Sequence, residues 1–197
     1  MTPEPSAFRQ MPDAGLLEAS AGGSHAAFAE IARRHYQPVY RLVWRMTNGA
    51  ADAEDMAQEA FVKLWRNPTQ VRDAAALKGW LMRVAANAAI DRGRKPRGTA
   101  LDHAPDVVDP QARPDAPLDR AQAARLVDAR IASLPERQRL ALSLVYFEGL
   151  SNIEAAAVLE VSVDALESLL ARARRGLKDS LSAGWRELLA GLAETGQ

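Results

Sequence analysis

The stretch around residues 83–94 carries side chains that could bind nucleic acid. Arg83, Asn87, Asp91 and Arg94 recur at three- and four-residue spacing, so a helix here would place them on one face. Arginines along such a face can contact successive phosphates, and the Asn87 amide can read a base edge. Charges at helical spacing also occur on ordinary solvent-exposed faces, so these residues alone leave both interpretations open.

A second candidate for DNA binding lies nearer the C-terminus. Residues 151–154, SNIE, fit the capping box of a short helix that ends near Leu159. Ser162 can cap a longer helix that carries Arg172, Arg174, Arg175 and Lys178. A short helix, a tight turn and a longer basic helix make a helix-turn-helix, in which the second helix enters the DNA major groove. Any two helices joined by a turn imitate this pattern.

An acidic cluster formed by Asp52, Glu54, Asp55 and Glu59 contrasts with these basic segments. Acids in a first helical turn favour the helix dipole, which explains Asp52 and Glu54 and explains Glu59 less well. The whole chain has 25 basic and 25 acidic residues, yet acidic and basic blocks alternate along it. This arrangement suggests two kinds of partner, a polyanion and a basic surface.

Composition excludes several classes of function. The chain has no cysteine, which rules out disulfides, thiolate metal sites and cysteine nucleophiles. The three histidines are scattered, and we see no catalytic triad, metal cluster or phosphate loop, so an enzyme is the weakest interpretation and we expect no cofactor and no metal. Because no apolar stretch is long enough to span a bilayer and the N-terminus does not read as a signal peptide, we expect a cytoplasmic protein without membrane insertion.

The elements that must position these residues are helices, so the expected fold class is all-α. Apolar residues at three- and four-residue spacing predict helices near 28–46, 52–66 and 77–94, and further helices after residue 118. Pro38 should kink or break the first of these helices. Five of the 11 prolines fall between Pro96 and Pro117, which indicates a linker. We therefore expect two small helical domains joined by a Pro- and Asp-rich linker.

Several runs of sequence match, in order, the motifs of one known family. Residues 52–66 read DAEDMAQEAFVKLWR and residues 80–92 read WLMRVAANAAIDR. Further on, LPERQR occupies 134–139, EGLS occupies 148–151 and EAA occupies 154–156. These runs resemble segments of region 2 and region 4 in the extracytoplasmic-function (ECF) sigma factors of the bacterial sigma-70 family. The joint match is far more specific than any single motif.

The resemblance implies a fold, a domain layout and a function. The domains would be an N-terminal tail at 1–13, a region 2 domain at 14–97, an acidic linker at 98–117, a region 4 domain at 118–182 and a C-terminal tail at 183–197. The protein would lend RNA polymerase its promoter recognition and would catalyse nothing itself. Its partners would be core RNA polymerase, promoter DNA and an anti-sigma factor that holds it inactive. The linker could enter the RNA exit path of the polymerase or serve only as a tether.

The resemblance also implies roles for individual residues. The acidic helix would dock on the polymerase clamp, with the following residues in or behind the contact: Asp52, Glu54, Asp55, Gln58, Glu59, Phe61 and Trp65. The loop from Asn67 to Lys78 would capture an extruded minus-ten base. The melted strand would be held by Lys78, Arg83, Asn87, Asp91, Arg92, Arg94 and Lys95. The last helix would read the minus-thirty-five element with Ser162, Asp164, Ala165, Glu167, Ser168, Ala171, Arg172 and Arg175.

The chain departs from the family at the start of the last helix. Asp164, Ala165 and Glu167 stand where the family usually has Gly, Thr and a basic residue. Carboxylates there repel phosphate but can accept a hydrogen bond from the amino group of cytosine, so the preferred upstream sequence stays open. Two other functions also stay open. One is a free-standing helix-turn-helix regulator, which would leave the acidic helix without a role. The other is a sigma-like protein that titrates an anti-sigma factor, which need not keep a basic DNA face.

Overall fold

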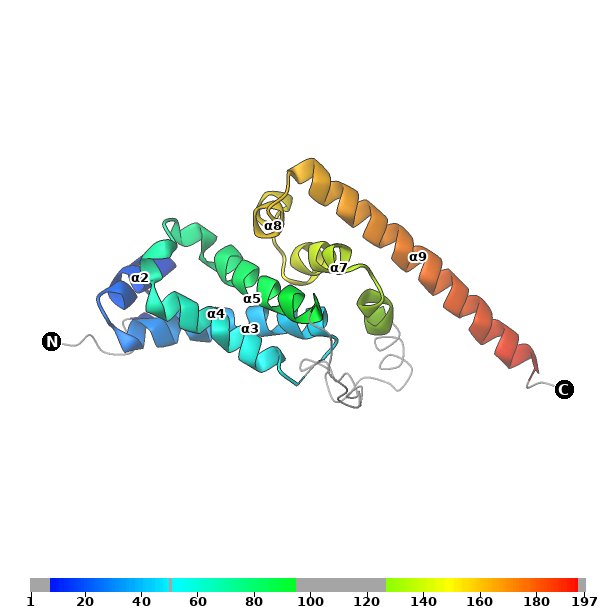
Figure 1. The fold of residues 1–197 in the computed structure, drawn as a ribbon, viewed down its shortest axis with the longest axis horizontal. Coiled ribbons are helices and arrows are strands. Elements are labelled where there is room, and N and C mark those ends of the chain that lie inside the picture. The colour runs from blue at the N-terminus through cyan, green and yellow to red at the C-terminus, as the bar shows by residue number, and fades with distance from the viewer. Residues whose placement is uncertain (1–7, 50, 95–126, 195–197) are drawn as a thin grey trace.

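The computed structural model describes residues 8–49, 51–94 and 127–194, with the side chains of residues 93–94 and 182–194 left aside. Within these ranges every regular element is a helix (Figure 1), as the all-α prediction required. The predicted linker at 98–117 and the first part of the predicted region 4 domain, 118–126, lie outside the described residues. None of the described helices combines the length and the apolar composition that a bilayer crossing needs.

The N-terminal half is a bundle built around one long helix. Helix α3 (His25–Thr47) packs against α2 (Asp13–Ala21), α4 (Ala53–Arg66) and α5 (Leu77–Arg94). Two short 3₁₀ turns, η1 (Pro68–Gln70) and η2 (Ala74–Ala76), connect α4 to α5. The core of the bundle consists of fully buried side chains that include Leu16, Ile31, Leu42, Leu64 and Leu81. The three- and four-residue spacing of these apolar residues explains why each helix buries one side.

Pro38 does not break the first long helix, so of the two predicted effects, a kink or a break, the break is wrong. Helix α3 runs from His25 to Thr47 with Pro38 inside it. Proline removes one backbone hydrogen bond at a cost of about 3 kcal/mol or more. Burial of Ile31 and Val39 on either side of the proline offsets that cost, because each fully buried aliphatic side chain contributes about 1.5–3 kcal/mol. The helix ends where Asn48 adopts a left-handed conformation with φ of 54°.

The C-terminal half contains the predicted helix-turn-helix. Residues 127–132 form a short helix, and α7 (Glu136–Leu142) continues into a π-helical turn, η3 (Ser143–Phe147), after which Gly149 adopts a positive φ. Helix α8 (Asn152–Leu159) then packs against α9 (Val163–Glu194). Helix α9 extends far from the body of the molecule (Figure 1) and is helical beyond residue 182, where a tail was expected.

Local capping explains where the two helices of this motif begin. The capping box is formed, because Ser151 Oγ accepts from the Glu154 amide and the Glu154 carboxylate accepts from the Ser151 amide at 2.8 Å. Ser162 Oγ accepts from the Ala165 amide at 3.2 Å, which caps α9 as predicted. Glu160, with φ of 55°, makes the tight turn between them.

The two halves share a core. Helix α5 packs against α8, and α3 packs against α7 and η3. One continuous cluster of buried apolar residues therefore runs from the N-terminal bundle through Leu140 and Leu144 into α8 and the first turns of α9. A smaller cluster around Ile131 and Ala173 joins α7 to α9. The sequence motifs contain no indication of the contact between the halves.

Candidate nucleic-acid interface

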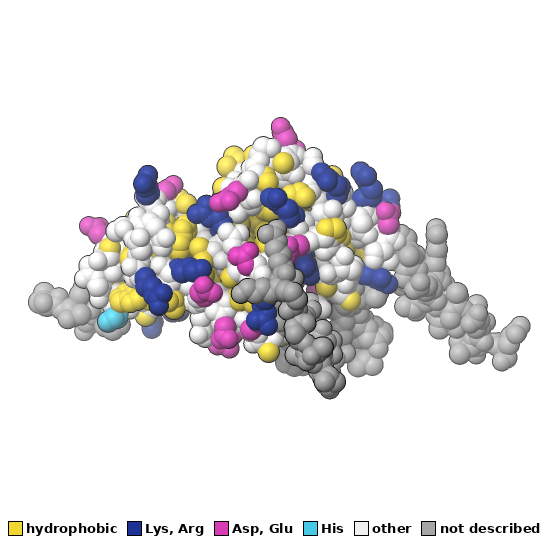
Figure 2. Space-filling model, viewed as in Figure 1, with side chains coloured by type: hydrophobic (Ala, Val, Ile, Leu, Met, Phe, Trp, Pro, Cys, Tyr) yellow, Lys and Arg dark blue, Asp and Glu magenta, His cyan; other side chains and the backbone are white. Residues whose placement is uncertain are grey.

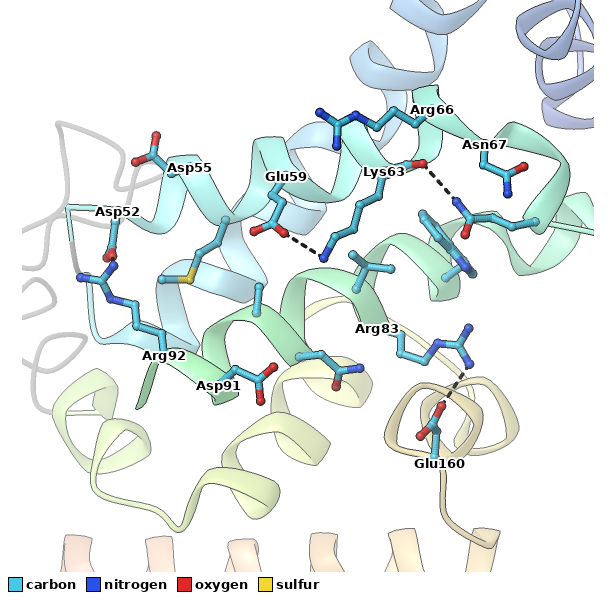
Figure 3. Close-up of a pocket in the computed structure, with 16 residues that line it drawn as sticks. Asp52, Asp55, Glu59, Lys63, Arg66, Asn67, Arg83, Asp91, Arg92 and Glu160 are labelled. Carbon is cyan, nitrogen blue, oxygen red and sulfur yellow. Dashed lines mark hydrogen bonds and ion pairs between the residues drawn. The ribbon is translucent and has the colours of Figure 1, made fainter. Parts of the chain in front are cut away.

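A groove of about 920 Å³ lies between α4 and α5 (Figure 3). Helix α4 lines one side with Asp52, Asp55 and Glu59, and α5 lines the other with the predicted strand-binding residues Arg83, Asn87, Asp91 and Arg92. The structure therefore brings two predicted sets together, the acids expected to dock on polymerase and the polar face expected to bind DNA. Glu160, from the turn between α8 and α9, reaches the edge of the same groove.

The acidic side chains at the start of α4 and along it differ in the ion pairs and hydrogen bonds that they form within the chain. Asp52 forms an ion pair with Arg92 across the groove, which links the two predicted sets (Figure 3). Glu59 pairs with Lys63 one helical turn on, with Oε1 and Nζ 2.8 Å apart and both side chains about half exposed. Gln58 donates to Glu54 at 3.1 Å, and Asp55 is exposed. Since exposed pairs of this kind contribute little, about 0–1 kcal/mol, Asp55 and Glu59 remain available to a basic partner.

The two aromatic residues of the predicted docking set lie behind that surface. Phe61 is buried, with its ring centroid 5.8 Å from that of Tyr36. Trp65 packs against His25 and Phe28 of α3, with centroid distances of 4.7 and 5.0 Å. These contacts fix the rotation of α4 about its axis and so determine which of its side chains face outward.

Four of the predicted minus-ten residues, Lys78, Arg83, Asn87 and Asp91, face the helix-turn-helix half of the chain. Lys78 Nζ donates to the backbone carbonyl of Glu148 at 2.6 Å. Arg83 Nη1 lies 3.3 Å from Glu160 Oε1. Asn87 and Asp91 line a cavity of about 210 Å³ together with Glu136 and Arg137 of α7. Arg92 is paired with Asp52, the side chain of Arg94 is not among those described, and Lys95 lies outside the described residues.

The loop between α4 and α5 is held in place by local hydrogen bonds. Asp73 accepts from the Ala75 amide at 2.9 Å and caps η2, while Gln70 Nε2 donates to the Lys63 carbonyl at 3.1 Å. Val71 is buried, and α2 packs against both 3₁₀ turns. The motifs did not indicate this support from α2, because it comes from a helix that precedes them in the chain.

Helix α9 has one buried face and one exposed face. Leu166, Leu170 and Ala173 are buried against α7 and α8. Of the predicted upstream-element set, Ala165 is half-buried and the exposed side chains are Ser162, Asp164, Glu167, Ser168, Ala171, Arg172 and Arg175. Basic side chains stand along this helix in the space-filling view (Figure 2). Asn152 Nδ2 donates to Glu167 Oε1 at 3.3 Å, which restricts the direction of that carboxylate; Asn152 was not among the predicted residues.

Comparison with known proteins identifies the family. Residues 31–99 match the family model described as Sigma-70 region 2, and residues 124–177 match that of Sigma-70 region 4. The chain is 31% identical over 192 residues to the RNA polymerase sigma-H factor of Pseudomonas aeruginosa, covering 90% of this chain and 98% of that protein. It is 33% identical over 165 residues to the ECF RNA polymerase sigma factor SigM of Mycobacterium tuberculosis, covering 84% of this chain and 82% of that protein. The chain belongs to the ECF sigma factors.

The fold of this sigma factor is also similar to a solved complex. CnrH in complex with the cytosolic domain of CnrY superposes with a TM-score of 0.66 at 27% identity, over 88% of this chain and 99% of that one. The likeness covers both halves, so the helices described above follow the fold of that protein over nearly its whole length.

The sigma factor body includes residues ahead of the region 2 match. Arg34 Nη1 lies 2.8 Å from Asp13 Oδ1, and His35 Nε2 lies 2.7 Å from the other oxygen of the same carboxylate, so α2 is tied to α3. Hydrogen bonds from Arg33 and Arg34 lower the pKa of the buried Glu30 carboxyl to about 2. This polar cluster lies away from the α4–α5 groove and supports the bundle from the side of α2.

Proposed function

We propose that this sigma factor binds core RNA polymerase, recognises and melts specific promoters and directs transcription initiation, as a binding subunit that catalyses nothing itself. The proposal assigns the region 2 domain to residues 14–97 and the region 4 domain to residues 118–182, with the linker at 98–117 and tails at 1–13 and 183–197. Its place of action is the cytoplasm, where the polymerase works. The tail at 183–197 includes the last part of α9. These domain bounds therefore refer to function and not to helix ends.

The observation that carries this proposal is the pairing of an acidic helix with a basic helix face along one groove. Asp55 and Glu59 point outward from α4, whose apolar side is anchored by Phe61 and Trp65. Across the groove Arg83 and Asn87 offer a phosphate contact and an amide. A free-standing helix-turn-helix regulator has no use for the acidic helix, and a titrating mimic has no use for the basic face.

The second half supplies contacts to duplex DNA in this proposal. The exposed face of α9 carries Arg172 and Arg175 for phosphates, and Glu167 near the start of the helix can contact a base edge. The caps at Ser151 and Ser162 hold α8 and α9 in a fixed relation, which DNA reading by a helix-turn-helix requires.

We also propose that a protein partner, an anti-sigma factor, regulates this chain. The similar protein CnrH was solved with the cytosolic domain of CnrY, which is an example of a fold like this one bound to a second protein. The chain has no cysteine, so a signal cannot reach it through its own thiol chemistry. A binding partner is then the simplest route for a signal.

The test is transcription in vitro with purified core polymerase. The parent chain should start transcription at its promoters, and the double variant Asp55→Lys, Glu59→Lys should bind core polymerase more weakly in a salt-matched titration while keeping its helical content. Glu18→Lys, an acid-to-lysine change at one exposed position of α2, is the control and should bind like the parent. Equal core affinity for the double variant and the parent would refute the docking role, and a parent that binds promoters without core polymerase would indicate a free-standing regulator.

A further inference from the structure

The loop between α4 and α5 is supported by a helix that lies far from it in the sequence. Helix α2 packs against both 3₁₀ turns of this loop, η1 and η2 (Figure 1). Leu16 and Leu17 of α2 belong to the same buried apolar cluster as Val71, which lies between the two turns. The neighbours of Val71 in the chain, Gln70 and Arg72, are exposed, so Val71 is the point at which this stretch of the loop enters the core.

Helix α2 has little local means of holding its own position. It is nine residues long, and isolated helices shorter than about 12–15 residues are marginal in water. Its N-cap is Pro12, whose side chain has no oxygen that could accept from the first amide groups. The position of α2 therefore depends on its contacts with the rest of the bundle.

Asp13, in the first turn of α2, supplies the polar part of those contacts. Its Oδ1 lies 2.8 Å from Arg34 Nη1, and its Oδ2 lies 2.7 Å from His35 Nε2. Each of the three side chains is at most 25% exposed, so salt screens these contacts less than it screens surface pairs. Because both oxygens of one carboxylate are bonded to α3, Asp13 restricts the rotation of α2 as well as its distance from α3.

Arg34 extends this anchor to the residues ahead of α2. Its Nη2 donates to the backbone carbonyls of Phe8 and Arg9, at 3.1 and 3.0 Å, and Phe8 is buried. Its Nε donates to Glu30 of α3 at 2.8 Å. The planar guanidinium holds its donors in a fixed geometry. One side chain therefore joins the segment before α2, α2 itself and α3.

The position of the loop matters if it captures a base of the minus-ten element. A binding site discriminates well only when its residues are held within about 0.5 Å of the productive geometry. Asp73 accepts from the Ala75 amide, and Gln70 donates to the Lys63 carbonyl. These hydrogen bonds join the loop to itself and to the end of α4. Helix α2 is the additional support that packs against both turns.

We propose that Asp13 is a positioning residue for promoter recognition. By fixing α2 on α3 through Arg34 and His35, it holds the α4–α5 loop in the place from which the loop selects the minus-ten base. This inference rests on the proposed function, because it supposes that the loop captures a base. That Asp13 holds the loop is supported by the contacts alone.

The first experiment measures the loop without transcription. The amides of Val71 and Ala76 donate to carbonyls within the loop, so their hydrogen exchange reports how often the loop opens. Asp13→Ala should speed this exchange about 10-fold, the size expected for the loss of a hydrogen bond to a charged group. Glu18→Ala removes an exposed carboxylate from the same helix and should leave the parent's rate unchanged. Unchanged exchange in Asp13→Ala would overturn the inference.

The second experiment measures base selection. Core polymerase with each variant transcribes promoters that differ at one base pair of the minus-ten element, and the readout is the ratio of the preferred base to the others. Asp13→Ala should lower this ratio about 5-fold, the low end of the discrimination that a good base contact supplies. Ser151→Ala removes a helix cap in the other half, so it controls for lost stability and should keep the parent's ratio.

A milder variant keeps the inference testable if Asp13→Ala folds poorly. His35→Ala removes one of the two contacts of Asp13 and leaves the Arg34 pair in place. It should speed the exchange of the loop and lower the base ratio, both by a smaller factor than Asp13→Ala. A loss of total activity with an unchanged ratio in His35→Ala would mean a merely structural role and would overturn the inference.

The outcomes separate this inference from the proposed function. If the parent initiates with core polymerase and Asp13→Ala keeps the parent's base ratio, the inference is overturned and the proposed function stands. If the parent fails to initiate, the proposed function fails and base selection by the loop fails with it, while the exchange rates still decide whether Asp13 holds the loop. Faster exchange together with a lower base ratio, in Asp13→Ala but not in Glu18→Ala, supports the inference.

Discussion

The faces of α5 and α9 are both polar helix surfaces with arginines, yet they differ in accessibility. On α5, Lys78 and Arg83 are bonded to the opposite half of the chain, and Asn87 faces it across a cavity. On α9, Arg172 and Arg175 are exposed. The difference shows that the basic side chains of a helix face can already be bonded to other residues of the same chain. It also implies that the two DNA contacts of the proposed function are not equally available before polymerase binds.

The largest expected effect concerns Glu148 and Glu160, the two carboxylates of the C-terminal half that pair with arginines of the N-terminal half. Removing one partner of a buried ion pair costs about 3–5 kcal/mol, whereas an exposed pair contributes about 0–1 kcal/mol. We therefore expect Glu148→Ala to speed hydrogen exchange in α5 and α8 strongly and Glu160→Ala to change it little, since the Glu160 side chain is 68% exposed. Similar exchange in the two variants would show that the buried pair does not dominate the contact.

A second prediction concerns strand binding by α5. Asn87→Ala should impair promoter opening more than initial closed binding, with a loss of about 1–3 kcal/mol if the amide reads a base. Arg83→Ala should show a smaller net loss, because it also removes the contact with Glu160 that competes with DNA. Permanganate reactivity of unpaired thymines measures opening. If a pre-melted template fails to relieve the Asn87→Ala defect, the residue has another role.

A third prediction concerns base reading by α9. Glu167→Lys should change the preferred upstream element, where a good base contact is worth about 1–3 kcal/mol, and should steepen the salt dependence of binding. Asn152→Ala should weaken discrimination between bases but leave the salt dependence unchanged, because it removes only the hydrogen bond that orients Glu167. Promoter libraries transcribed at two salt concentrations provide both readouts. An unchanged preference in both variants would mean that Glu167 points to solvent when DNA is bound.

Arg172→Ala should have a smaller and more uniform effect. A phosphate contact carries no sequence information, so we expect all upstream sequences to bind more weakly by a similar factor. The slope of log affinity against log salt should fall by about 1. A selective loss for one upstream sequence would instead assign Arg172 to base reading. Because the Arg172 side chain is already exposed, this loss should not depend on the contact between the two halves.

The smallest expected effect concerns a carboxyl that lies away from both DNA faces. Hydrogen bonds from Arg33 and Arg34 lower the pKa of Glu30 to about 2 from an ordinary 4.5. A carboxyl whose pKa is lower in the folded state than in the unfolded state stabilises the fold at pH values above the unfolded pKa. This stabilisation is lost as pH falls from about 4.5 towards 2. Glu30→Gln should lower the melting temperature at neutral pH and flatten its dependence on pH in that window. Equal pH profiles for the variant and the parent would contradict the arginine contacts.

Much of the local structure was predictable because its causes lie within a few residues. The capping box at Ser151 and the cap at Ser162 depend on hydrogen bonds to residues three positions away. The apolar spacing that defines α4 and α5 likewise depends on neighbours three and four residues apart. The break that was expected as one alternative at Pro38 is absent, because the packing on both sides of the proline, which keeps α3 continuous, involves other helices.

The sequence by itself determined most of the helices, the caps at Ser151 and Ser162, the family and the identity of the polar faces. Only the tertiary structure decided which of those faces are covered. Glu148 meets Arg45 across 103 residues of chain and Arg41 across 107. No periodicity or spacing rule relates residues so far apart, because their contact depends on how two domains pack. In the sequence, Glu148 is part of the EGLS motif of the helix-turn-helix half. Only the packing of the two halves shows that it pairs with Arg41 and Arg45.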